Sequence, residues 1–172
     1  MFRVWARGKN EETRVTAYHQ QTIMVIDDQK PVRELIASMV AKLGFGEVVV
    51  AEDGVHALDK LASSRPDLIV CDYTMPFLSG LDFVAALRLG LTAADPMTPL
   101  IMLTADADQQ KIRAAAWLGV QDFLRKPVSV DTLTDRVAYA LANPPTTPAN
   151  MVDLSLVQDK LASAVQERAA AQ

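Results

Sequence analysis

Five short, nearly continuous apolar runs recur along this chain and limit what it can fold into. They lie at residues 22–26, 47–51, 68–72, 99–103 and 120–124, and segments with apolar residues at helical spacing separate them. A strand buried on both faces is apolar throughout, whereas a half-buried strand alternates apolar and polar residues. The pattern therefore predicts an α/β protein: a doubly wound, five-stranded parallel sheet with helices on both faces and right-handed crossovers.

The segments between the runs carry helix signals. Pro31 suits the first turn of a helix because it lacks an N–H group, and Gly44 suits a left-handed cap at the end of that helix. Further helices are expected at about 54–62, 81–89, 108–118 and 129–141. The apolar residues at helical spacing are expected to face the core. They are Val32, Leu35, Ile36, Met39, Val40 and Leu43 in the first helix, and Ile112, Ala115 and Ala116 in the fourth.

The chain divides into three parts. Residues 1–21 show no clear period and are expected to form an N-terminal arm. Residues 22–143 hold all five runs and form the globular domain, and residues 144–172 hold a proline-rich linker and a separate amphipathic helix. The apolar side of that helix is expected to contain Leu154, Val157, Leu161, Ala164 and Val165.

Composition and charge narrow the setting. The 172 residues include 17 basic and 21 acidic side chains without a long basic block, so nothing favours a nucleic-acid partner. The single cysteine, Cys71, lies inside an apolar run, as is typical of a reducing compartment. No apolar run approaches the roughly 18 residues of a membrane span, and the N-terminus lacks the apolar core of a signal peptide. We therefore expect a soluble, cytoplasmic protein with no membrane partner.

Polar side chains stand where the predicted strands end. Asp27 and Asp28 follow the first run, and Asp72 ends the third. Thr104 follows the fourth run, and Lys126 follows the fifth. The carboxyl ends of parallel strands lie on one edge of the sheet, where such folds bind ligands. Residues spread over a hundred positions are therefore expected to form one site.

The composition of this site indicates phosphoryl chemistry. Three carboxylates in one place repel one another unless a cation neutralises them, and oxygen ligands without His or Cys favour Mg²⁺. Lys126 would hold an oxyanion together with the hydroxyl of Thr104, which suits phosphoryl transfer. Asp72 is the candidate nucleophile, because a carboxylate can attack phosphorus to give an aspartyl phosphate.

Four motifs in this order resemble those of one known family. They are Val25–Asp28, Cys71–Pro76 with Gly80, Leu103–Ala105 and Phe123–Pro127. Together they resemble the receiver domain of bacterial two-component response regulators, over about Thr22 to Asn143. The resemblance implies a flavodoxin-like sheet with strand order 2-1-3-4-5.

The resemblance also assigns expected roles to the site residues. Asp72 would accept a phosphoryl group from a histidine kinase or a histidine phosphotransfer protein, with Mg²⁺ required. Asp28, Asp72 and the backbone carbonyl of Thr74 would bind the metal directly, and Asp27 would bind it through a water molecule. Lys126 would pair with the acceptor or the phosphoryl oxygen, and the Lys126–Pro127 peptide bond would be cis.

A switch is implied as well. Phosphorylation adds charge and acceptor oxygens at Asp72, so Thr104 should move toward it and vacate space for an aromatic side chain. Phe123 matches that aromatic position in the family, although an ordinary core role fits it equally well. The face made by the segments 108–118, 120–124 and 129–141 would then report the change to a downstream protein.

Other interpretations remain open. The tail after Asn143 is too short for a helix-turn-helix output domain with its own core, so a single-domain regulator similar to chemotaxis or phosphorelay proteins is expected. Its helix would form a homodimer, dock on the reporting face, bind a partner or remain a weakly structured extension. A haloacid-dehalogenase-like phosphatase is an alternative, although Thr74 stands where that class has a second aspartate. A pseudo-receiver that only binds is another, against which the complete acidic set argues.

Overall fold

The computed structural model describes residues 18–106, 108–145 and 153–172. Most of the predicted arm, 1–21, and of the predicted linker lies outside these residues. The division into arm, globular domain and tail therefore stays a prediction. Among the helices that the structure describes, none combines the length and the apolar character needed to cross a membrane.

The described strands form one parallel sheet, as predicted. Its strands are β1 (Thr22–Ile26), β2 (Glu47–Ala51), β3 (Leu68–Asp72), β4 (Leu100–Thr104) and β5 (Asp122–Arg125). They pair in the order β2-β1-β3-β4-β5, and every neighbouring pair is parallel. The predicted α/β class and strand order are confirmed.

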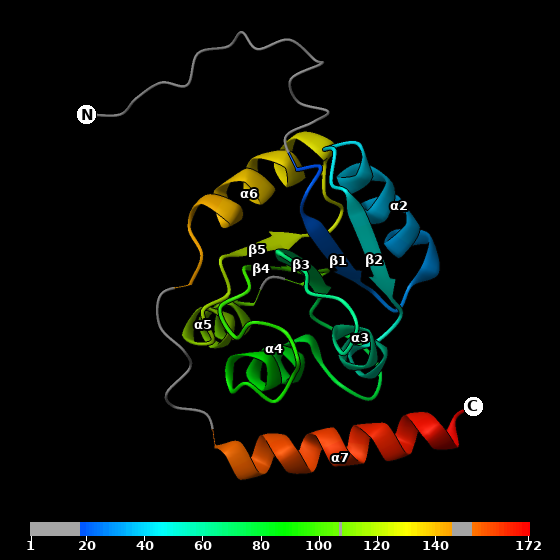
Figure 1. Cartoon of the computed structure of the whole chain (residues 1–172). Helices are drawn as coiled ribbons and strands as arrows, with labels where there is room; N and C mark the ends of the chain where they lie inside the picture. Colours follow the sequence, from blue (N-terminus) through cyan, green and yellow to red (C-terminus); the bar gives the residue numbers. More distant parts are fainter. Residues whose placement is uncertain (1–17, 107, 146–152) are drawn as a thin grey trace, which may run out of the picture.

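Helices cover both faces of the sheet (Figure 1). Helices α2 (Lys30–Ala41) and α6 (Val130–Ala142) pack on one face, and α3 (Gly54–Leu61), α4 (Gly80–Arg88) and α5 (Gln109–Trp117) lie on the other. The side chains of the central strands β1, β3 and β4 alternate between two apolar clusters, one on each face. This explains why those runs are apolar throughout.

Some side-chain orientations were predicted wrongly. Strand β2 lies at the edge of the sheet, so Val50 is 40% exposed instead of buried on both faces. Leu35, expected in the core, is 55% exposed. Ile112 and Ala116 are also exposed, while Ala115, which was expected in the core together with them, is buried. Periodicity shows that a helix has an apolar side, but the neighbouring elements decide which part of that side is covered.

The C-terminal helix α7 (Leu154–Ala170) packs against α3 and α4 (Figure 1). Its inward stripe consists of Val157, Leu161 and Ala164, with Val157 and Ala164 buried. Leu154 and Val165, which were expected on that stripe, are exposed. The helix therefore docks on its own domain. It does so on α3 and α4, and not on the face of α5, β5 and α6 that was one of the alternatives.

Candidate functional site

The register of the sheet brings the predicted site residues together. Ile26 pairs with Cys71, so Asp27 and Asp72, the next residues along, lie side by side at the carboxyl ends of β1 and β3. Asp72 pairs with Leu103, which precedes Thr104. The backbone N–H of Lys126 donates to the carbonyl of Thr104 at 2.7 Å, which holds the end of β5 against the end of β4.

Lys126 joins two of the aspartates. Its Nζ atom lies 2.9 Å from a carboxylate oxygen of Asp72 and 2.6 Å from one of Asp27. Asp27 is fully buried and Asp72 is 4% exposed. Burial raises the pKa of Asp72, and the hydrogen bond and charge of Lys126 oppose this rise only in part. Burial lowers the pKa of Lys126, but the two carboxylates outweigh it and leave that pKa raised.

The three aspartates form a cluster with the composition of a cation site. One carboxylate oxygen from each of Asp27, Asp28 and Asp72 lies within 4.8 Å of the other two. Asp28 is exposed, so the cluster is open to solvent on one side. A donor set made only of oxygen atoms fits Mg²⁺, which keeps several of its waters. Thr74, whose carbonyl is the expected further ligand, lies in the exposed loop after β3.

The turns on either side of the acceptor have defined geometry. The Lys126–Pro127 peptide bond is cis. Gly80, at the start of α4, packs so tightly against the backbone carbonyl of Asp72 that a Cβ atom would collide with it. Its N–H donates to the carbonyl of Tyr73 at 2.9 Å. A glycine is therefore needed where α4 begins beside the end of β3.

The Thr104 hydroxyl bonds to the backbone of Asp106 in this structure. It donates to the backbone carbonyl of Asp106 at 2.8 Å and accepts from the N–H of Asp106 at 3.1 Å. Lys111 of α5 pairs with the Asp106 carboxylate at 3.3 Å and lies 5.3 Å from the centroid of the Tyr73 ring. The hydroxyl thus belongs to a network that links the site to α5.

Phe123 is partly buried on the α3–α5 side of the sheet. Its ring meets that of Tyr73 edge to face, with centroids 6.0 Å apart. Tyr73 directly follows Asp72, so the aromatic pair connects the acceptor strand to β5. This packing places Phe123 against the residue that directly follows Asp72.

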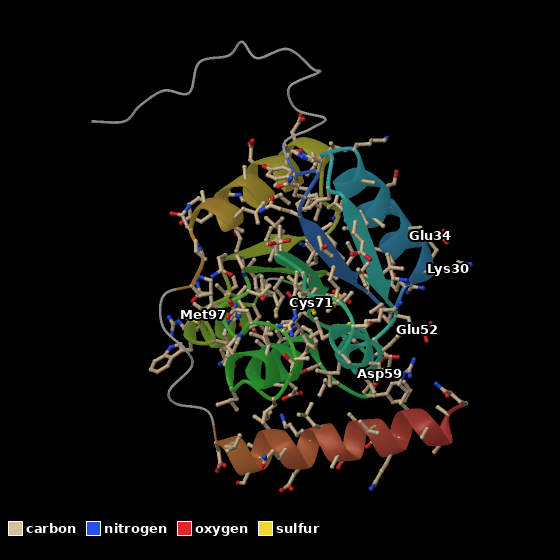
Figure 2. All side chains as sticks on the ribbon, viewed as in Figure 1. Lys30, Glu34, Glu52, Asp59, Cys71 and Met97 are labelled. Carbon is tan, nitrogen blue, oxygen red and sulfur yellow. The ribbon has the colours of Figure 1, made fainter. Side chains whose placement is uncertain are left out.

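Several residues near the site were missed from the sequence. Arg33 of α2 donates to the backbone carbonyl of Asp27 at 2.6 Å. Arg168 of α7 pairs with Asp53 at 2.8 Å and with Glu52 at 3.0 Å. Figure 2 shows Glu52 on the side of the molecule where α7 ends. Arg168 follows Ala164 at helical spacing, which is the one sequence signal that would have placed it on the inward stripe.

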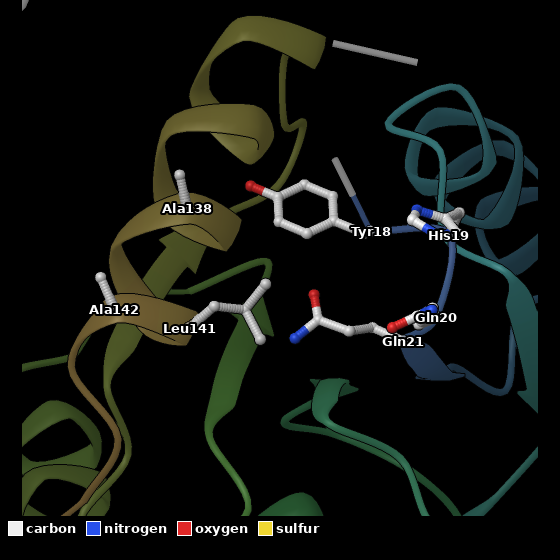
Figure 3. Close-up of a pocket in the computed structure, with 7 residues that line it drawn as sticks. All are labelled: Tyr18, His19, Gln20, Gln21, Ala138, Leu141 and Ala142. Carbon is white, nitrogen blue, oxygen red and sulfur yellow. The ribbon is translucent and has the colours of Figure 1, made fainter. Parts of the chain in front are cut away.

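A separate pocket lies near the opposite edge of the sheet (Figure 3). It has a volume of about 470 Å³ and lies between α6 and the segment that precedes β1. Its walls are Tyr18, His19, Gln20, Gln21, Ala138, Leu141 and Ala142. None of the predicted site residues lines it, so the candidate site is the acidic cluster.

Comparison with known proteins gives the family. Residues 23–138 match the model of the response regulator receiver domain. The DNA-binding response regulator MtrA of Mycolicibacterium paratuberculosis is 31% identical over 139 residues, which are 81% of this chain and 59% of MtrA. The chain thus spans about three fifths of the length of this relative, and the absence of a nucleic-acid partner stays a prediction.

Solved structures agree in fold. Chemotaxis protein CheY4 of Vibrio cholerae is 29% identical, with a TM-score of 0.64 over 70% of this chain and 98% of that one. The receiver domain of sensor histidine kinase PA1611 from Pseudomonas aeruginosa PAO1 was solved with a magnesium ion coordinated in its active site cleft. It is 26% identical, with a TM-score of 0.63 over 72% of this chain and 98% of that one. The sheet order, the cluster of strand-end residues and the family match together show that this chain belongs to the response regulator receiver domain family of two-component signalling.

Proposed function

We propose that this chain is a phosphorylation switch that accepts a phosphoryl group on Asp72. The donor is the phosphohistidine of a histidine kinase or of a histidine phosphotransfer protein. The observation that carries the proposal is the position of Asp72: a nearly buried carboxylate at a strand end, paired with Lys126 and grouped with two more aspartates. Three grouped carboxylates repel one another, which costs free energy, so this arrangement is not expected of residues that only stabilise the fold.

The proposed step follows from these groups. A carboxylate oxygen of Asp72 attacks phosphorus, the P–N bond to the donor imidazole breaks, and the imidazole leaves as its nitrogen regains a proton. Mg²⁺, held by Asp28, Asp72 and the Thr74 carbonyl and through water by Asp27, would neutralise the charge of the phosphoryl oxygens. Lys126 already lies 2.9 Å from Asp72 and would shift to a phosphoryl oxygen.

The proposed output runs through Thr104. The Thr104 hydroxyl would leave the backbone of Asp106 for the new phosphoryl oxygens, which disturbs the contact between Asp106 and Lys111 of α5. Phe123 packs edge to face on Tyr73 and would adjust to the space that Thr104 vacates. The face of α5, β5 and α6 would therefore change and bind a downstream protein.

Labelling with a small phosphodonor tests the proposal. Incubation with acetyl phosphate and Mg²⁺ should add one phosphoryl group to the mass of the protein, and Asp72→Asn should abolish the addition. Asp59→Asn, at an exposed position on α3, is the matched control and should be labelled like the wild type. Absence of labelling in the wild type with any phosphodonor would contradict the proposal, and steady hydrolysis of phosphate monoesters would favour a phosphatase instead.

A further inference from the structure

Helix α7 carries two cations that pair with carboxylates at the starts of the helices beneath it. Lys160 lies 2.6 Å from Asp82, in the first turn of α4. Arg168 lies 2.8 Å from Asp53, the N-cap residue of α3. One ion pair joins α7 to α4 and the other joins it to α3, and only the second lies beside Asp28 of the acidic cluster.

Arg168 borders a pocket that reaches the acidic cluster. The pocket has a volume of about 340 Å³, and Asp28 lines it together with Arg168 and the two residues that follow α7, Ala171 and Gln172. Glu52, Asp53, Pro76 and Phe77 complete its walls. The Arg168 side chain is only partly exposed and is fixed by two carboxylates, so its charge has a defined position in the wall of this pocket.

The charges around this pocket and the acidic cluster beside it are mostly negative. The carboxylates are those of Asp27, Asp28, Glu52, Asp53 and Asp72. Lys126 already pairs with Asp27 and Asp72, and Arg33 donates to the backbone carbonyl of Asp27. Arg168 pairs with both Glu52 and Asp53, so its loss would leave the rim beside Asp28 with one more net negative charge. A phosphodonor is itself an anion, so a pocket rim with this negative charge would repel it as it approaches Asp72.

We propose that Arg168 of α7 is an entrance residue that admits anionic phosphodonors to Asp72 by compensating the acidic rim formed by Glu52 and Asp53. The proposal rests on the function proposed above and assigns α7 a part in it. It also explains why the inward stripe of α7 extends beyond Ala164 to a charged residue near the end of the helix. The same positive charge should weaken the binding of Mg²⁺ at Asp28, because like charges repel.

Three variants test this assignment. Arg168→Gln removes the charge at the entrance, and Arg168→Lys keeps it. Lys160→Gln is the matched control, because it removes an equal charge and an ion pair of α7 far along the helix from the entrance. Labelling by acetyl phosphate at saturating Mg²⁺ should be about threefold slower for Arg168→Gln at low ionic strength. This difference in labelling rate from the wild type should vanish at about 0.5 M salt. Both Arg168→Lys and Lys160→Gln should be labelled at the wild-type rate.

A second readout needs no phosphoryl transfer. Calorimetric titration with Mg²⁺ alone should show about threefold tighter binding for Arg168→Gln, with Lys160→Gln unchanged. Equal Mg²⁺ affinity and equal labelling in Arg168→Gln and Lys160→Gln would overturn the assignment, and so would a labelling defect that high salt does not relieve. If the wild type is never labelled but Mg²⁺ binding responds to Arg168 as expected, the proposed function fails while the electrostatic role of Arg168 stands.

Discussion

The Nζ atom of Lys126 lies 2.9 Å from Asp72, and it lies 2.6 Å from Asp27 as well. One ammonium group thus compensates two carboxylates that are almost completely buried. Removing it leaves both carboxylates without a paired cation, and Asp27 then keeps the backbone N–H of Gln29, 2.9 Å away. This contact therefore affects both the proposed reaction and the stability of the fold.

Lys126→Met should slow labelling of Asp72 by acetyl phosphate about a hundredfold, because a fixed cation for the phosphoryl oxygens is lost. The rate of mass increase in the presence of Mg²⁺ measures this. Lys42→Met, at an exposed position after α2, is the control and should be labelled normally. A Lys126→Met rate within twofold of the wild type would show that Lys126 does not touch the transferred group.

The same variant should lose about 2 kcal/mol of stability at neutral pH without Mg²⁺. The pKa of Asp72, already raised, should rise further, so the folded state binds a proton more strongly than the unfolded chain. Stability then increases as pH falls from neutral toward the ordinary aspartate pKa, and the deficit should shrink. Urea unfolding of both proteins at several pH values measures this difference in the free energy of unfolding. A difference that does not change with pH would contradict the electrostatic explanation.

Mg²⁺ should stabilise the wild-type protein against heat, because it binds the folded aspartate cluster and not the unfolded chain. At a concentration 100 times the Kd the expected gain is about 2.7 kcal/mol. Asp28→Asn removes one of the clustered carboxylates and should remove most of the gain, and Asp59→Asn should retain it. Melting curves with Mg²⁺ and with a chelator measure this stabilisation. If Mg²⁺ stabilises Asp28→Asn as much as the wild type, the ion binds at another site.

Thr104→Ala should separate phosphorylation from its output. Asp72 should still be labelled, but the backbone amide resonances of α5, β5 and α6 should shift much less on labelling than in the wild type. The reason is that the hydroxyl bonded to Asp106 is missing and cannot be redirected. Thr104→Ser keeps the hydroxyl and should respond fully. If the amide resonances of Thr104→Ala shift on labelling as much as those of the wild type, Thr104 is not part of the proposed route.

Arg88 should contribute strongly to stability through its backbone partners. The residue is 2% exposed, and its guanidinium donates to four carbonyls, those of Pro96, Thr98, Leu118 and Gly119. Burial lowers the pKa of Arg88 to about 10, partly offset by the charge of Asp95. Arg88→Met leaves these carbonyls without a donor and should cost about 3 kcal/mol in denaturant unfolding. Arg113→Met, on the exposed side of α5, should cost less than about 0.5 kcal/mol.

Local patterns in the sequence determined the sheet and the membership of the site. A run such as Leu68–Asp72 is apolar throughout only if both faces are covered, and parallel strands carry their carboxyl ends to one edge. Asp27, Asp72 and Lys126 therefore had to meet, whatever the exact packing of the helices. These inferences need only the apolar runs, the residues that follow them and their alternation with helical segments, all of which the sequence shows.

Only the tertiary structure decided which surfaces the helices cover and which distant charges pair. The burial of Ala164 and the exposure of Val165 depend on where α7 lies over α3 and α4, which its own periodicity does not specify. Arg168 and Asp53 are 115 positions apart in sequence, and nothing local to either residue indicates the other. Such contacts arise because packing of the whole domain selects one arrangement among many that satisfy the same local patterns.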